Sequence, residues 1–311
     1  AALSACAAAR RWRAALLALR RAAKVEHLDV VCWNAAISAC ERGAAWPHAM
    51  SLLSELCRDR ARETPVVPDI VSFNATASAC AKGHRWREAL WLLGEALTLT
   101  LQPNVITFNS AASACGGAKV WRRAAQLLAA AESADVPPDV VTYNAVVAAV
   151  AKAGLWIHAC SVLAALVTSR LSPDMFTWNS TISACEGAGH WMQALWALQE
   201  TRRGDLRPDH FSYNATIGAC AAGQAWREAA ALLAEMAVAG PGPELVAWSG
   251  AVAACSLGLR WADACAALAD MRSRQLIPNS ITRVAVEAAC KRVASAPTAA
   301  RAAVPLQASV G

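Results

Sequence analysis

An asparagine directly follows an aromatic residue six times along this chain, at a nearly constant spacing. The spacing is 40 residues once and 35 residues afterwards, and Ser249 continues the series at the next step. The asparagines are Asn34, Asn74, Asn109, Asn144, Asn179 and Asn214. An amide has donors and an acceptor, so it can pair with the edge of a pyrimidine base. Because Asn costs about 0.5 kcal/mol relative to Ala inside a helix, six copies indicate a function. The alternative is a hydrogen bond from each amide to a neighbouring backbone group.

A second polar residue closes each repeat unit, directly before the next helical pattern. These closing residues are Asp69, Asn104, Asp139, Asp174, Asp209, Glu244 and Asn279. Asp and Asn are good helix N-caps, so capping alone could explain most of them. Glu244 would cap poorly. Capping and a role in binding are compatible, because one side chain can serve both.

Two further rows recur near the start and the end of the first helical pattern. The first row is apolar and consists of Val31, Val71, Ile106, Val141, Phe176, Phe211, Val246 and Ile281. Ordinary core packing is the alternative to a binding role for this row. The second row contains the cations Arg42, Lys82, Lys152 and Arg292. These would meet phosphates along one edge, or they are solvated helix ends that suit the helix dipole. Gly117, Gly187, Ala222 and Leu257 fill the same slot elsewhere, so the basic edge is incomplete.

No pattern in the sequence indicates catalysis, a metal or a cofactor. Twelve Cys are present, but eight of them occupy one repeated slot that Val150 fills once, so the slot needs a small buried residue. There is no CxxC pair for zinc, no deaminase pattern, no acidic cluster and no Gly-rich phosphate loop. No segment is a credible apolar 20-mer for a membrane. The net charge of +6 permits an anionic partner without requiring one. A binding protein is therefore favoured over an enzyme.

The elements that carry these residues form a repeat of two helices. A Trp series with the same steps marks the second helix of each unit and is predicted to lie in the core: Trp46, Trp86, Trp121, Trp156, Trp191, Trp226 and Trp261, preceded by Trp12. A single helix pair cannot bury its own apolar face, so neighbouring pairs must stack. Full repeats are expected at 30–69, 70–104, 105–139, 140–174, 175–209, 210–244 and 245–279, with partial repeats at 1–29 and 280–293. Residues 294–311 are expected to be a disordered tail.

Variants of "VVTYNA…AKAG…A…L…PD" occur in nearly every unit, and over residues 1–293 this pattern resembles the pentatricopeptide repeat family in its pure 35-residue form. The resemblance implies an all-α fold, a right-handed α-solenoid superhelix of stacked antiparallel helix pairs, with first helices lining the concave face. There are two departures. The Cys and second-helix Trp are unusually regular, and Arg283-Val284 replaces the aromatic-Asn pair in the last partial unit. That unit is expected to be a cap that does not read a base.

Members of this family bind single-stranded RNA, one base per repeat. The resemblance implies that the Asn ladder and the closing residues select bases, and that the apolar row sandwiches them. Asn with closing Asp resembles a uracil pair, Asn74 with Asn104 a pyrimidine reader, and Ser249 with Asn279 an adenine pair. Asn214 with Glu244 departs from the usual code. The expected function is RNA metabolism in a plastid or mitochondrion, without a cofactor or small-molecule substrate. The chain begins inside a repeat and without Met, which suggests a fragment or a processed product, and no transit peptide can be read. The alternative function is a protein-interaction scaffold that binds no RNA.

Overall fold

The computed structural model describes residues 2–22, 29–58, 66–238, 240–258, 260–280, 282–284 and 287. Within these residues the secondary structure is helical, and no strand is present. The predicted tail at 294–311 lies outside the described residues, as do Ile281 and Arg292. The described chain therefore has the all-α architecture that the sequence predicts.

Helices alternate between a first and a second helix of each pair. The first helices are α1 (Ala2–Ala8), α3 (Val30–Arg42), α5 (Ile70–Lys82), α7 (Val105–Gly117), α9 (Val140–Lys152), α11 (Met175–Glu186), α13 (His210–Ala222) and α15 (Leu245–Leu257). The second helices are α2 (Trp12–Ala22), α4 (Trp46–Arg58), α6 (Trp86–Thr98), α8 (Trp121–Ser133), α10 (Trp156–Thr168), α12 (Trp191–Arg203), α14 (Trp226–Val238) and α16 (Trp261–Ser273). Each described second helix therefore begins at the Trp of the repeat pattern.

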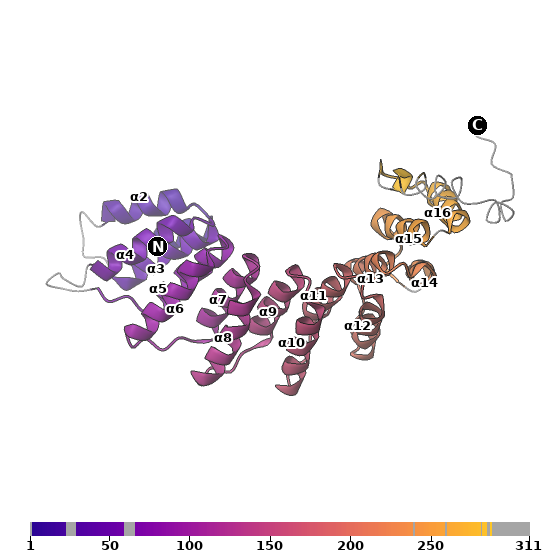
Figure 1. Cartoon of the computed structure of the whole chain (residues 1–311). Helices are drawn as coiled ribbons and strands as arrows, with labels where there is room; N and C mark the ends of the chain where they lie inside the picture. The colour runs from indigo at the N-terminus through magenta and orange to yellow at the C-terminus, as the bar shows by residue number, and fades with distance from the viewer. Residues whose placement is uncertain are drawn as a thin grey trace. The chain divides into compact units, whose positions relative to one another are not determined.

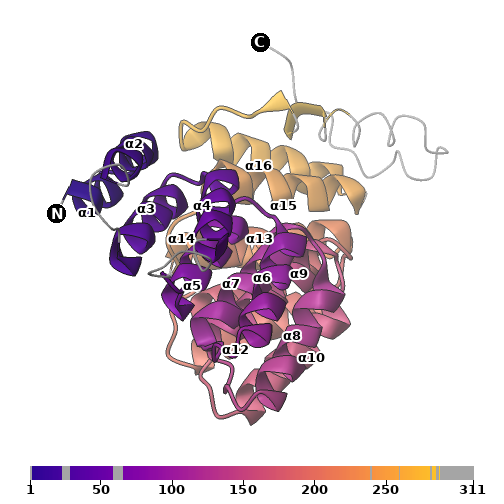
Figure 2. The same cartoon turned by 90° about the vertical axis from the view of Figure 1, so that its left-hand side faces the viewer.

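The chain divides into two compact units, and the division falls within α10. The first unit contains residues 1–153 and 161–172, and the second contains residues 154–160 and 173–311. In the first unit, α3, α5, α7 and α9 follow one another as neighbouring first helices (Figure 1). The pair α1–α2 lies beside the pair α3–α4 in both views (Figures 1 and 2).

The second unit has the same local order. Helices α11, α13 and α15 contact one another in sequence, and the second helices α12 and α14 each contact the next first helix as well as their own. Each unit is thus an α-solenoid of stacked helix pairs. The handedness of the superhelix stays a prediction.

Small residues on the first helices form the centre of each stack. The Ala that recurs in every repeat is fully buried from α3 to α15, for example at Ala39, Ala79, Ala114 and Ala254. The next residue is Cys40, Cys80 or their equivalents, and Val150 in one repeat, and it is also buried. These Cys are free thiols, and burial raises the pKa of Cys80 and Cys220 to about 12. The prediction that this slot holds a small buried residue is confirmed.

The second-helix Trp pack at the boundary between repeats. The described Trp side chains of this series are half-buried, so the prediction that they belong to the core is only partly right. A Cβ on Gly83 would lie 2.5 Å from Cδ1 of Trp46, which belongs to the preceding repeat. Gly83 has a negative φ of −88°. This Gly is therefore needed for the close approach of the Trp and not for an unusual backbone conformation.

Candidate nucleic-acid interface

The ladder asparagines meet the closing residues of their own repeats. Asn34 Nδ2 lies 3.0 Å from Asp69 Oδ1, and Asn74 Nδ2 lies 3.1 Å from Asn104 Oδ1. The same contact joins Asn109 to Asp139 at 3.1 Å and Asn179 to Asp209 at 3.2 Å. In these four repeats the amide donates to a side chain rather than to a neighbouring backbone group. The structure therefore brings together the two residues that the resemblance assigns to one base.

The two members of the remaining Asn–Asp pair, Asn144 and Asp174, belong to different compact units. Asn144 lies on α9 in the first unit and is buried. Asp174 precedes α11 in the second unit and caps that helix. Each of the two residues thus has the local setting of its counterparts in the other repeats.

The closing residues also cap the helices that follow them. Asp69, Asp139, Asp174 and Asp209 each accept a hydrogen bond from the third backbone N–H of the next helix, at 2.8–2.9 Å. Asn104 and Asn279 do the same at 3.2 and 2.8 Å. The predicted capping role is confirmed at these positions. Glu244 makes no side-chain cap, also as predicted.

Burial and hydrogen bonding act in opposite directions on the closing carboxylates. Burial alone would raise the pKa of Asp69, but hydrogen bonds from Ser72 and Asn34 outweigh it and lower the pKa. The pKa of Asp209 is lowered in the same way by Ser212 and Asn179. Both carboxyl groups are therefore ionised at neutral pH and can only accept hydrogen bonds.

A hydroxyl from the following repeat completes each of these four sites, and the repeat pattern of the sequence does not predict it. Ser72 Oγ donates to Asn34 Oδ1 at 2.5 Å, and Thr107 Oγ1 donates to Asn74 Oδ1 at 2.6 Å. Equivalent bonds run from Thr142 to Asn109 and from Ser212 to Asn179. The available signal was a Ser or Thr three residues after the closing residue, which sequence analysis attributes to helix capping.

The repeat at 210–244 lacks this arrangement. The third residue of the next helix is Ala247, which has no hydroxyl. Glu244 lies with its Oε1 3.6 Å from His210 Nδ1. Asn214 Oδ1 is buried and has no hydrogen-bond partner among the described residues. The Asn side chain of this repeat is therefore not held as in the others.

Ser249 reaches its closing residue through a hydroxyl. Ser249 Oγ donates to Leu245 O at 2.7 Å and lies 2.9 Å from Thr282 Oγ1. Thr282 Oγ1 in turn lies 2.6 Å from Asn279 Oδ1. The Thr282 hydroxyl thus joins Ser249 to the closing Asn.

The apolar row is exposed. Between 51 and 66% of each side chain is accessible to solvent. The row consists of Val31, Val71, Ile106, Val141, Phe176, Phe211 and Val246. Core packing, the alternative given by the sequence, is therefore wrong for these residues. Each row member precedes its ladder residue by three positions on the same first helix, so both lie on one side of that helix.

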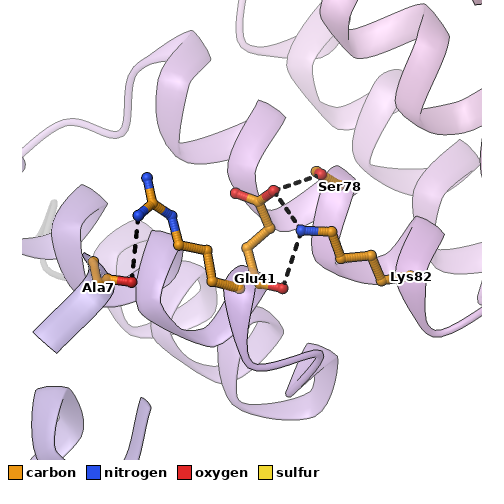
Figure 3. A network of polar contacts seen from close by, with 5 residues as sticks. Ala7, Glu41, Ser78 and Lys82 are labelled. Atoms are coloured by element: carbon orange, nitrogen blue, oxygen red, sulfur yellow. Dashed lines mark hydrogen bonds and ion pairs between the residues drawn. The ribbon is translucent and has the colours of Figure 1, made fainter. Parts of the chain in front are cut away.

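The basic row contacts the ends of the preceding first helices. Arg42 Nη1 lies 3.5 Å from Ala7 O, and Lys152 Nζ lies 3.3 Å from Gly116 O. Lys82 Nζ lies 3.3 Å from Glu41 O and 3.0 Å from Glu41 Oε1, and Ser78 donates to the same carboxylate (Figure 3). The carbonyl groups at a helix C-terminus carry partial negative charge. The three cations thus line one edge of neighbouring first helices, and phosphate contact stays a prediction.

Glu186 occupies the slot of Glu41 in a later repeat without the same partners. The positions of Ser78 and Lys82 are taken there by Gly218 and Ala222. The Glu186 carboxylate lies where a Cβ on Gly218 would be. Burial raises the pKa of this carboxyl.

The described part of the chain contains neither a cluster of potential metal ligands nor a helix that could span a membrane. No group of three or more His, Cys, Asp and Glu side chains there could hold a metal ion. No helix among these residues is long and apolar enough to cross a bilayer.

Two family models match parts of the sequence. The pentatricopeptide repeat domain model matches residues 126–188, and the PPR repeat model matches residues 71–98. No curated protein sequence matches this chain significantly.

Solved structures provide the broader comparison. The crystal structure of the pentatricopeptide repeat protein PPR10 from maize is 26% identical, with a TM-score of 0.69 over 91% of this chain and 40% of that chain. PPR10 in complex with an 18-nucleotide psaJ RNA element is 23% identical, with a TM-score of 0.59 over 93% of this chain and 46% of that chain. At 23% identity, the likeness to the RNA complex of PPR10 shows a shared fold and nothing more. The chain spans less than half the length of either structure.

Proposed function

We propose that this chain, which belongs to the pentatricopeptide repeat family, binds single-stranded RNA with one base per repeat. Each base is selected by a ladder residue together with its closing residue. The apolar row contacts the faces of the bases, and Arg42, Lys82 and Lys152 contact phosphates. In the family, RNA lies with its 5′ end at the N-terminal repeats, and we propose the same direction here.

The observation that carries this proposal is the exposed apolar row. A soluble helix has no folding reason to expose an apolar side chain at the same position of seven successive repeats. The faces of RNA bases are apolar and can lie against such side chains. The ladder residue of the same repeat lies on the same side of the helix as the apolar side chain, and in four repeats its amide contacts the closing residue. A scaffold for proteins would not require this pairing in each repeat.

The proposed target is U-(C/U)-U-U-U-any-A. Each letter follows from the ladder residue and the closing residue of one full repeat, in chain order. Uracil corresponds to the repeats at 30–69, 105–139, 140–174 and 175–209, cytosine or uracil to 70–104, and adenine to 245–279. The repeat at 210–244 receives no preference, because Asn214 and Glu244 do not form the pair seen in the other repeats.

Recoding one repeat tests the proposal. The double variant Asn109→Ser with Asp139→Asn reproduces the adenine pair of Ser249 and Asn279. The new Asn at position 139 is still a good N-cap for α9. The measurement is a titration with four oligonucleotides that differ only at the third base. The wild type should prefer U there and the double variant A, by about tenfold. The preference at the fifth base, which Asn179 and Asp209 select, is the internal control.

Two other outcomes would reject the proposal. If the double variant keeps its preference for U, the ladder does not select bases as in the family. If neither protein binds any of the four oligonucleotides, the chain is better explained as a protein-interaction scaffold.

We also propose that binding occurs without turnover, in a plastid or mitochondrion. The matching family models describe repeats and name no reaction. PPR10, the maize protein of the comparison, is known from its structure with an RNA element. Purified protein should leave bound RNA intact with or without divalent metal. Cleavage or deamination that survives removal of contaminating nuclease would refute this part.

A further inference from the structure

The amide of a ladder Asn has two partners of opposite kind. Its nitrogen donates to the closing residue of its own repeat, and its oxygen accepts from a hydroxyl of the next repeat. At Asn74 these partners are Asn104 Oδ1 at 3.1 Å and Thr107 Oγ1 at 2.6 Å. At Asn34 they are Asp69 at 3.0 Å and Ser72 at 2.5 Å.

The two partners determine the orientation of the amide. The oxygen and nitrogen of an amide have nearly the same size, so a rotation by about 180° exchanges donor and acceptor without changing the shape. An ionised Asp accepts only, so it requires the nitrogen on its side. A hydroxyl that donates requires the oxygen on its side. Reversing the amide would therefore place two acceptors against each other at the closing residue.

In two repeats the hydroxyl oxygen lies closer to the Asn oxygen than to the closing residue, which favours donation to the Asn. Thr107 Oγ1 is 2.6 Å from Asn74 Oδ1 but 3.2 Å from Asn104 Oδ1. Ser212 Oγ is 2.6 Å from Asn179 Oδ1 but 2.9 Å from Asp209 Oδ1. Thr107 also accepts from the backbone N–H of Asn104 at 3.2 Å, which occupies a lone pair and leaves the proton for Asn74.

One repeat supplies the contrast within the same chain. Next to Asn214, the closing Glu244 makes no cap and lies toward His210, and Ala247 takes the place of the hydroxyl. The Asn214 oxygen is buried without a partner among the described residues. Neither of the two contacts that orient the other amides is present there.

We propose that the third residue of a repeat, where it is Ser or Thr, is a positioning residue for the base-selecting Asn of the preceding repeat. Its hydroxyl keeps the amide in one orientation, so that the second Nδ2 hydrogen remains for a carbonyl oxygen of a pyrimidine. Asn214 lacks this hydroxyl, so its amide can present either the nitrogen or the oxygen to a base and discriminates poorly between pyrimidines and purines. This inference rests on the proposed RNA-binding function and adds a residue that acts through the Asn, without contact to the base.

Thr107→Val provides the first test, because valine has nearly the shape of threonine and lacks the hydroxyl. The measurement is the ratio of affinities for oligonucleotides with a pyrimidine or a purine at the second base. We expect Thr107→Val to reduce this ratio about three- to tenfold, as for the loss of one hydrogen bond. Thr107→Ser keeps the hydroxyl and should keep the ratio. The ratio at the third base, selected by Asn109, should not change in either variant.

These outcomes separate a positioning role from a structural one. A purely structural role of Thr107 would weaken binding at all bases equally and leave the ratio unchanged. If Thr107→Val binds RNA with an unchanged ratio, the inference is wrong. The proposed function would still stand in that case, because it depends only on sequence-selective RNA binding by the wild type. Loss of all discrimination in Asn74→Ala confirms that the second base is read at this repeat.

The reverse change tests the same inference without removing a contact. Glu244→Asp with Ala247→Thr restores both partners of Asn214. The sixth base should then be discriminated about three- to tenfold in favour of a pyrimidine. Glu244→Asp alone is the matched control, and it should give a smaller preference. If the double variant discriminates no better than this control, the hydroxyl does not orient the amide. If Thr107→Val does not fold, this second test alone decides whether the hydroxyl orients the amide.

Discussion

Replacing Glu244 by Asp should stabilise the start of α15. The structure provides seven closing residues for comparison, and Glu244 is the one that makes no side-chain cap. An Asp at this position can accept from the Ala247 N–H, as Asp209 accepts from the Ser212 N–H at 2.8 Å. An N-cap of this kind contributes about 1 kcal/mol. The change also removes the 3.6 Å contact with His210, whose loss costs at most about 0.5 kcal/mol because both side chains are exposed.

The expected net gain is therefore about 0.5–1 kcal/mol, and it is local. Repeat arrays do not unfold in one step, so a global melting temperature would dilute the effect. Hydrogen exchange of the peptide covering residues 245–250 is the better measurement. Protection there should rise about two- to fivefold, the equivalent of this free energy.

Asp209→Glu is the matched control in the neighbouring repeat. It removes the cap of α13 and the bond from Asn179, so the start of α13 should lose protection by more than α15 gains. If Glu244→Asp leaves protection unchanged, and Asp209→Glu does so as well, then the closing residues do not stabilise the helices they precede.

Three further predictions concern the rows and the half-buried carboxylate. Changing Arg42, Lys82 and Lys152 together to Ala should make the log–log salt dependence of RNA binding less steep by about 2, at about 0.7 per phosphate contact; an unchanged slope would leave these residues as contacts between helices. Ile106→Ser should change the free energy of unfolding by less than about 0.5 kcal/mol, since the side chain is exposed, but should weaken RNA binding about three- to tenfold; Ile106→Leu should retain affinity. The raised pKa of Glu186 means that the folded state binds the carboxyl proton more strongly than the unfolded state does. The stability that this proton contributes is therefore lost as the pH rises through the pKa of the folded state. Glu186→Gln should therefore melt higher than the wild type at pH about 8 and equally at pH about 4, and an equal melting temperature at both would contradict the assignment.

The repeat pattern was sufficient to predict the local fold. Pro-Asp before an apolar-periodic segment predicts a capped helix, and α5, α9 and α13 begin directly after Asp69, Asp139 and Asp209. Such signals are local, because a cap acts within one helical turn. The position of the Trp was harder to predict. A Trp at helical spacing can pack on the first helix of its own repeat or on the next repeat. The hydrophobic periodicity is the same in both cases and does not distinguish them.

The candidate site was predictable in its residues but not in its bonds. Asn34 and Asp69 could be paired only by resemblance, since 35 residues separate them. The Ser72 hydroxyl looks like an ordinary cap residue until the stacking places it beside Asn34. Lys82 and Glu41 are 41 residues apart, and their contact follows from the packing of α3 against α5. Bonds of this kind depend on the register between repeats, which a single repeat does not contain.

The hydroxyl bond between successive repeats bears on how such arrays can be recombined. An exchange of residues 70–104 would transplant Asn74 and Asn104 together but would leave Thr107 to the recipient. Under the proposed function, a donor segment inserted before an Ala, as at Ala247, would carry its two proposed base-selecting residues into a site without the orienting hydroxyl. The proposal therefore makes the transferable module longer than the sequence period, extending it to the third residue of the following helix. Chimeras joined after that residue should retain the specificity of the donor, whereas those joined at the 35-residue boundary should inherit it only when the recipient offers Ser or Thr.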